Sequence, residues 1–269
     1  MVAEVVRIAL CVEYAGDAFE GWQSQAHGRT VQDHLERAIG NIAGHALRTH
    51  CAGRTDTGVH ATAQVVHFDC PVDRPLSAWV RGVNNSLKVP ITVRWAQAVD
   101  DQFHARFSAV ARRYRYVLHN SNTRPALLAG RAGWFHLPLD ADRMDQAASR
   151  LLGHHDFTSF RAAGCQGKTP MRWMHEARVQ RDGEFLLFDF HANGFLHHMV
   201  RNLVGALVMV GKGARPPEWI EEVLQARDRS LAAPTFPAGG LYLCGVDYPA
   251  RWPLPGDGRI IAVPRFPVV

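Results

Sequence analysis

Hydrophobic and polar positions along the first hundred residues follow two different periods. Residues 6–12 alternate apolar with polar or small side chains, and this period of two predicts a β-strand. Thr30 and Asp33 stand in capping-box spacing ahead of apolar residues on one helical face, which predicts a helix from about residue 31. Further strands are expected near 46–52, 62–70 and 91–95, with a short helix near 76–88.

The second half of the chain repeats this pattern at greater length. Strands are expected at 112–119 and 241–246, a hairpin at 176–191, and helices at 140–152, at 196–210 and after Pro216. Because helices and hairpins mix without regular strand–helix alternation, the pattern predicts an α+β fold rather than a doubly wound sheet. We expect two ferredoxin-like halves with mostly antiparallel sheets, a continuous core and a central basic cleft.

The junction between the halves, near residues 100–110, contains no glycine- or serine-rich linker. We therefore expect two domains that share one interface, an N-terminal α+β domain at 1–105 and a C-terminal α+β domain at 106–269. Interfaces of that kind are favoured places for clefts.

Composition and charge narrow the class of protein. A hydrophobic content of 47% with 20% charged residues is ordinary for a soluble chain, and the longest apolar stretch, 203–211, is too short to span a bilayer. We therefore expect a cytoplasmic protein. The five cysteines are scattered without a CxxC pair, which argues against a disulfide framework or a cysteine-based zinc site.

Charge is uneven along the chain. Residues 106–269 carry 21 Lys+Arg against 14 Asp+Glu, and the segment from Gln102 to Leu139 holds six arginines and no acid. An acid-free basic strip favours an anionic partner such as nucleic acid.

A glycine-flanked turn at residues 53–61 carries the strongest candidate for chemistry. Asp56 lies between Gly53 and Gly58, with Arg54 two positions earlier and strand-like residues on both sides. Such a turn can lift one carboxylate out of a sheet, where rigid scaffolds commonly place reactive groups. The alternative is a polar hairpin whose Asp and Thr side chains cap their own backbone.

The arginine-rich strand in the second half presents different residues on its two faces. Arg112, Tyr114 and Tyr116 share one face, while Arg113 and Arg115 take the other. Aromatic rings beside arginine can stack a base and hold its phosphate, so the three arginines are candidate RNA contacts. The alternative is a half-buried strand whose tyrosines pack in the core while its arginines stay hydrated.

Arg201 lies on an otherwise apolar helix, on roughly the same face as His197 and His198. A guanidinium on an apolar helix needs an acid partner, and Asp56 is a candidate. The alternative is that the Arg201 side chain reaches the surface from a core helix. Adjacent histidines cannot both face one ion from a regular helix, and no HExxH motif occurs, so no metal is expected. Phosphate-binding motifs of the GxxxxGKS/T and GxGxxG types are absent as well, and no cofactor is expected.

Seven segments, in this order, resemble the tRNA pseudouridine synthase A family, and the likeness runs nearly end to end. They are FEGWQ at 19–23, GRTDTGVHA at 53–61, FHARFSA at 103–109, YRY at 114–116, HDFTSFR at 155–161, FLHHMVRN at 195–202 and GLYL at 240–243. The main departure is Thr57, where the family more often has alanine. It adds one methyl and one hydroxyl group and puts nothing essential in doubt.

The resemblance implies isomerisation of uridine to pseudouridine at positions 38, 39 and 40 of the tRNA anticodon stem-loop, by a homodimer without metal or cofactor. It implies that Asp56 is the nucleophile and Arg201 its salt-bridge partner. Tyr114 would stack on the target base and is a candidate acceptor of the C5 proton. Leu241 would wall the pocket, and Arg54 would fill the space left by the flipped-out nucleotide.

The reaction itself requires such residue types. It breaks the C1′–N1 bond, turns the uracil over and joins C1′ to C5, and a carboxylate can attack covalently or stabilise a sugar cation. Attack at C1′, attack at C6 and a glycal route remain open. A nearby guanidinium favours the ionised carboxylate, and an aromatic ring can hold a base that has left its stack.

Two other classes of function compete with the isomerase. The first is a non-catalytic RNA-binding module, which is disfavoured because Asp56, Tyr114 and Arg201 are all intact. The second is a nucleoside hydrolase, which is disfavoured because no second acid motif accompanies Asp56.

Overall fold

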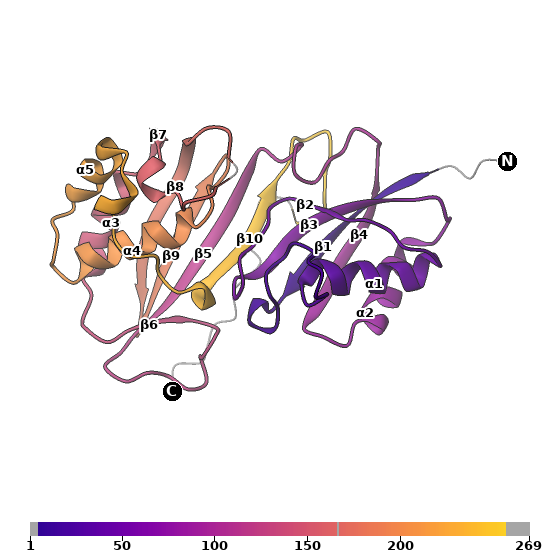
Figure 1. Ribbon diagram of the computed structural model, residues 1–269, viewed down its shortest axis with the longest axis horizontal. Helices are drawn as coiled ribbons and strands as arrows, with labels where there is room; N and C mark the ends of the chain where they lie inside the picture. Colours follow the sequence, from indigo (N-terminus) through magenta and orange to yellow (C-terminus); the bar gives the residue numbers. More distant parts are fainter. Residues whose placement is uncertain (1–4, 166, 257–269) are drawn as a thin grey trace. The chain divides into compact units, whose positions relative to one another are not determined.

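The computed structural model describes residues 5–165 and 167–256 (Figure 1). The two domains expected from the sequence also include residues 1–4, 166 and 257–269, which lie outside the described part. The chain divides into two compact units, one formed by residues 5–110 with 243–256 and the other by residues 111–242. Both units combine helices with mostly antiparallel strands. The mixed fold class with mostly antiparallel sheets is therefore confirmed.

The first unit is built on β1 (Val6–Tyr14), the strand expected from the alternating pattern. It pairs antiparallel with β3 (His60–Cys70) on one side and β4 (Ile91–Val99) on the other. The two-residue β2 (His50–Cys51) pairs with β3, and β10 (Leu241–Asp247) follows β3 in the strand order. Nearly every residue of β3 is buried, because this strand lies inside the sheet and both of its faces are covered.

The helices of the first unit begin where the sequence supplies caps. The capping box of α1 (Val31–Ala43) forms as expected, since Asp33 N donates to Thr30 Oγ1 at 3.3 Å and Thr30 N donates to Asp33 Oδ2 at 3.2 Å. α1 ends at Gly44, whose φ of 81° is the left-handed conformation that glycine adopts without strain. The expected short helix is present as a π-helical turn, Ala78–Gly82, that leads into α2 (Val83–Ser86).

Residues 243–256 return to the first unit, although the sequence analysis assigned all of 106–269 to a second domain. The hydroxyl of Tyr248 donates to Ala105 O at 2.7 Å, and Trp252 Nε1 donates to Asp100 Oδ2 at 3.0 Å. The rings of Tyr248 and Phe103 also lie 5.0 Å apart. These long-range contacts have no local pattern in the sequence.

The second unit contains strands in the order β5–β9–β8–β7, and β6 pairs parallel with β5. The expected hairpin of β8 and β9 forms, and it is longer than the pattern indicated. The strands are β5 (Ala111–Asn120), β6 (Gly133–Phe135), β7 (Gly153–Asp156), β8 (Met171–Asp182) and β9 (Phe185–Ala192).

Three helices pack on this sheet, namely α3 (Ala141–Ser149), α4 (Met199–Gly211) and α5 (Trp219–Ala226). α3 contacts β8 and α4, and α5 contacts β7 and α3. A Cβ at Gly211 would lie 2.5 Å from Met144 Sδ, so the glycine allows α3 and α4 to approach closely. In the part of the chain that the structure describes, 3₁₀ turns occur at Gly16–Ala18 in the first unit and at Thr158–Phe160, Arg229–Leu231 and Ala238–Gly240 in the second.

Candidate active site

Asp56 lies on the loop between β2 and β3, on a turn that its own backbone closes. Val59 N donates to Asp56 O at 3.1 Å, and Gly58, inside the turn, has a φ of 81° that favours glycine. The Asp56 side chain is half-buried and Arg54 is exposed. The turn therefore presents the carboxylate from a fixed backbone.

Side chains from β1 and β3 hold this turn from beneath. The hydroxyl of Tyr14 lies 2.7 Å from Thr55 Oγ1, and both residues are buried. Gln64 Nε2 donates to Gly53 O at 2.6 Å. These bonds fix the residue directly before Asp56 and the glycine that opens the turn.

The segment at 19–23 packs against the same turn, and the close approach explains its glycine. Trp22 N donates to Thr55 O at 3.0 Å. Gly21 has a φ of 81°, and a Cβ there would lie only 3.2 Å from Thr55 O. Any larger residue at 21 would be strained and would press on the turn.

A second close approach secures the far side of the turn. Gly16 N donates to Nδ1 of the buried His60 at 3.0 Å. A Cβ on Gly16 would overlap the carbonyl group of Val59. Because Val59 N closes the Asp56 turn, a side chain at 16 would disturb it.

Tyr114, in the second unit, is half-exposed on β5. Its ring meets that of Phe195 edge to face, with the centroids 5.0 Å apart and the planes at 80°. Tyr116 is different, because it is fully buried and its hydroxyl donates to Pro237 O at 2.9 Å. Of the two tyrosines expected on this face of the strand, Tyr114 therefore has an accessible ring and Tyr116 does not.

The three arginines of β5 have different surroundings. Arg115 forms a two-pronged ion pair with Asp189 on β9, from Nε at 2.7 Å and Nη2 at 2.9 Å. Arg112 Nη1 donates to Asn193 O at 3.4 Å, and Arg113 lies opposite His191 in the sheet register. The pairing of Arg115 was missed because Asp189 is 74 residues away in the sequence.

Arg201 lies in the first turn of α4 and is half-buried. Its Nε donates to Phe236 O at 2.8 Å, and Phe236 N donates to Arg201 O at 3.2 Å. A Cβ on Gly205, one turn later, would overlap Pro234 O, so the helix lies tight against this segment. The guanidinium is therefore oriented by backbone contacts within the second unit.

Asn202 ties the same helical turn to its surroundings, and sequence reasoning assigned it no role. It is fully buried, and its Nδ2 donates to Phe160 O at 2.8 Å. Its Oδ1 accepts from Thr235 Oγ1 at 2.6 Å and from Arg229 Nη2 at 3.1 Å. A buried amide with both ends satisfied holds the start of α4 in one position.

Leu241, the first residue of β10, is 5% exposed. A Cβ at the preceding Gly240 would lie 2.5 Å from Val117 O, so the glycine lets the chain pass directly over β5. The predicted pocket role of Leu241 and the predicted pairing of Arg201 with Asp56 stay predictions.

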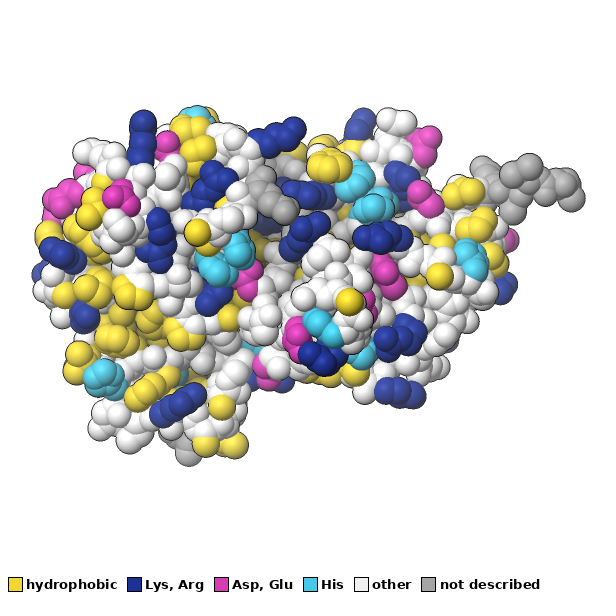
Figure 2. Space-filling view, in the orientation of Figure 1, with side chains coloured by type: hydrophobic (Ala, Val, Ile, Leu, Met, Phe, Trp, Pro, Cys, Tyr) yellow, Lys and Arg dark blue, Asp and Glu magenta, His cyan; other side chains and the backbone are white. Residues whose placement is uncertain are grey.

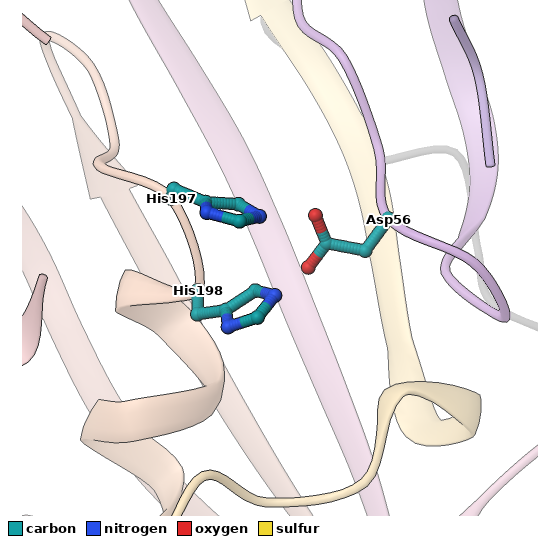
Figure 3. A group of neighbouring side chains, drawn as sticks. All are labelled: Asp56, His197 and His198. Carbon is teal, nitrogen blue, oxygen red and sulfur yellow. The ribbon is translucent and has the colours of Figure 1, made fainter. Parts of the chain in front are cut away.

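His197 and His198 stand on the segment before α4, and Asp56 stands on the loop before β3 (Figure 3). The two histidine rings lie 3.9 Å apart, and His198 has a left-handed φ of 60°. The two histidines were expected on a regular helix, and this expectation is wrong because α4 begins only at Met199. The predicted absence of a metal stays a prediction.

No helix in residues 5–165 and 167–256 has the length and hydrophobicity to cross a membrane.

The family model described as tRNA pseudouridine synthase matches residues 10–108 and 147–249. The tRNA pseudouridine synthase A of Aromatoleum aromaticum is 69% identical over 98% of this chain and 100% of the relative. That of Dechloromonas aromatica is 59% identical over 93% of this chain and 95% of the relative. The chain belongs to the tRNA pseudouridine synthase A family.

Family membership confirms the resemblance and the enzyme class expected from the sequence, an isomerase that acts on uridine in tRNA. The ranges matched by the tRNA pseudouridine synthase model include Arg54, Asp56, Arg201 and Leu241, while Tyr114 falls between them. The alignments with the two relatives span 98% and 93% of this chain, so they extend into this intervening stretch.

A solved structure of an archaeal box H/ACA sRNP Nop10–Cbf5 complex matches with a TM-score of 0.35 and 12% identity, over 87% of this chain and 57% of that chain. This likeness is too remote to bear on the site.

Proposed function

We propose that this enzyme isomerises uridine at positions 38, 39 and 40 of the tRNA anticodon stem-loop, with Asp56 as the nucleophile. The observation that carries the proposal is the fixed turn around Asp56. It is closed by Val59 N and anchored through Thr55 to Tyr14 and Trp22, while its carboxylate remains half-exposed. A single carboxylate on a rigid backbone suits attack on a substrate that must be held in one orientation.

The isomerisation can be written with one reactive carboxylate. On the C1′ route, an Asp56 oxygen bonds to C1′ as the C1′–N1 bond breaks and its electrons pass to the uracil. The uracil then turns over, C5 bonds to C1′, and the carboxylate leaves. The C5 proton departs to a base, N1 gains a proton, and no external acid is consumed. Attack at C6 and the glycal route also require the ionised carboxylate.

Arg201 and Tyr114 complete the proposed site. Arg201 would favour the ionised form of Asp56, and its fixed orientation against Phe236 supports such a role. Tyr114 would stack on the flipped-out uracil and accept the C5 proton, and its half-exposed ring beside Phe195 supports that role.

Arg54 and Leu241 take the remaining places in this proposal. Arg54, exposed two residues before Asp56, would fill the space left by the flipped-out nucleotide. Leu241 would form an apolar wall of the pocket, which its burial at the start of β10 supports.

The proposal extends to the assembly of the protein. The two units would be ferredoxin-like domains around a basic cleft, the first carrying the Asp56 turn and the second most of the positive charge. The enzyme would act as a homodimer in the cytoplasm without metal or cofactor. Arg112 and Arg113 would contact the RNA backbone, whereas Arg115 is engaged by Asp189.

The test uses tRNA transcripts that carry one uridine in the anticodon arm, at 38, 39 or 40, or at 36 as a control. Pseudouridine is located by carbodiimide adduct formation and primer extension. We expect conversion at the first three positions and none at 36. Conversion elsewhere in the tRNA, or conversion at only one of the three positions, would contradict the assigned specificity.

A further inference from the structure

The first unit carries a cluster of rings outside the catalytic turn. His50 on β2, His67 on β3 and His104 lie with ring centroids 4.6 to 5.4 Å apart. Phe107 extends this cluster outward, with its ring 4.3 Å from that of His104 and tilted by 34°. His67 is buried, whereas His50 is exposed.

Phe107 is 76% exposed, a large fraction for an aromatic ring. A single exposed apolar residue is ordinary. This one, however, has the Arg106 guanidinium 5.6 Å from its centroid and an imidazole against it. A ring bordered by a cation and an imidazole suits a partner that combines a flat π face with negative charge, as a nucleotide does.

The loop that carries Phe107 is held in place by its own hydrogen bonds. Arg106 N and Phe107 N both donate to His104 Nδ1, at 3.1 and 3.3 Å. Ala105 N donates to His67 Nδ1 at 3.1 Å. Because the loop is ordered before a ligand arrives, little conformational entropy remains to be lost on binding.

Arg54 of the Asp56 turn and Arg106 of this loop both act on the same buried thiol. Burial raises the pKa of the Cys51 thiol on β2 to about 12, and Arg54 and Arg106 both oppose that shift electrostatically. Both guanidinium groups therefore lie within electrostatic reach of Cys51. Histidine side chains and basic side chains (Lys or Arg) lie next to one another on the visible face of the first unit in Figure 2.

Asp69, an acid whose charge acts on His67 of the cluster, is already paired. Asp69 accepts from Arg7 Nε at 2.7 Å and from Arg7 Nη2 at 2.8 Å. Its negative charge is thus compensated and does little to repel an anion.

We propose that His50, His104, Arg106 and Phe107 form a second nucleotide-binding surface of the enzyme. An unpaired base of the tRNA stacks on Phe107, and the adjoining phosphate lies against Arg106 and the imidazoles. The inference rests on the proposed function, because it takes the bound RNA to be the tRNA whose uridine reaches Asp56. It adds RNA contacts on the first unit to those proposed for Arg54 and Asp56.

The test measures the Kd of unmodified tRNA by filter binding for Phe107→Ala, Phe107→Trp and a matched control, Leu76→Ala. Leu76 is an exposed apolar residue of the same unit, 42% exposed. We expect Phe107→Ala to raise Kd roughly 5- to 100-fold, the loss typical of one stacked base. Phe107→Trp and Leu76→Ala should stay within about threefold of the wild type.

Arg106→Gln provides a second measure of the same surface. It should weaken binding and reduce the slope of log K against log salt by about one phosphate contact. Because all these readouts measure binding, they are independent of whether the wild type releases tritium from C5-labelled uridine, which tests the proposed function.

An unchanged Kd for both Phe107→Ala and Arg106→Gln overturns the inference. Sedimentation velocity identifies the competing occupant: if Phe107→Ala dissociates an assembly while its Kd for tRNA is unchanged, the surface binds a second copy of the chain instead.

Discussion

The hydroxyl of Tyr14 lies 2.7 Å from Thr55 Oγ1, directly beneath the residue that precedes Asp56. Tyr14 comes from the end of β1 and Thr55 from the loop before β3, 41 residues further along the chain. The carboxylate thus owes its placement to a buried contact that no local pattern reveals. Substitutions can separate what this hydrogen bond contributes to the free energy of unfolding from what it contributes to the position of Asp56.

Tyr14→Phe removes this hydrogen bond and should lower kcat about 3- to 10-fold while leaving the KM for tRNA nearly unchanged, because a slightly misplaced nucleophile slows chemistry more than binding. The free energy of unfolding should fall by about 1 kcal/mol. Steady-state kinetics and urea denaturation measure the two effects.

The control is Asn84→Ala, which removes two hydrogen bonds to Val93, at 2.9 and 2.7 Å, elsewhere in the same unit. It should lower stability without changing kcat. An equal loss of kcat in both variants would show that Tyr14 acts only through general stability.

Arg115 should behave as a structural residue. Its ion pair with Asp189 is largely buried, with side chains 22% and 11% exposed, so Arg115→Ala leaves a carboxylate without its cation. We expect the free energy of unfolding to fall by roughly 1–3 kcal/mol in urea denaturation. The double variant Arg115→Met/Asp189→Leu should recover part of that loss, and no recovery would contradict the pairing account.

Arg113 provides the contrast on the same strand. Arg113→Ala should weaken tRNA binding and flatten its dependence on salt by about one phosphate contact, with little effect on stability. Filter binding between low and moderate salt measures the slope. An unchanged slope would remove Arg113 from the path of the RNA.

His67 should make stability depend on pH. Burial, followed by the charges of His104, His50 and Arg7, lowers the pKa of His67 to about 3, from an ordinary value near 6.5. The unfolded chain therefore binds a proton that the folded protein refuses, and stability falls as pH drops from about 6.5 towards 3.

Urea denaturation of the wild type and His67→Gln at pH 7.5 and 5 checks this prediction. The loss of stability between the two pH values should be smaller in the variant, by on the order of 1 kcal/mol. Equal losses would mean that other groups account for the acid sensitivity.

Features fixed by neighbouring residues could be predicted from the sequence. The capping box of Thr30 and Asp33 and the strand period of β5 form where expected, and the apolar helix α4 forms with its start three residues later than expected. Each depends on side chains within one or two turns, so the pattern contains the information needed.

Features fixed by distant residues could not be predicted. Asp189 on β9 pairs with Arg115 on the neighbouring strand β5. Tyr14 and Gln64 hold the Asp56 turn from β1 and β3. Residues 243–256 return to the first unit. His198 also takes a left-handed conformation that delays the start of α4. A single sequence contains no period or spacing from which such pairings follow.

The central claim, that Asp56 is the one carboxylate the isomerisation needs, is tested most directly by release of tritium from tRNA labelled at C5 of uridine. We predict that the wild type releases tritium without freeing uracil. Asp56→Ala should release none while binding tRNA within about threefold of the wild type, because phosphate contacts dominate affinity. Release by Asp56→Ala at the wild-type rate, or loss of tRNA binding together with activity, would contradict this account.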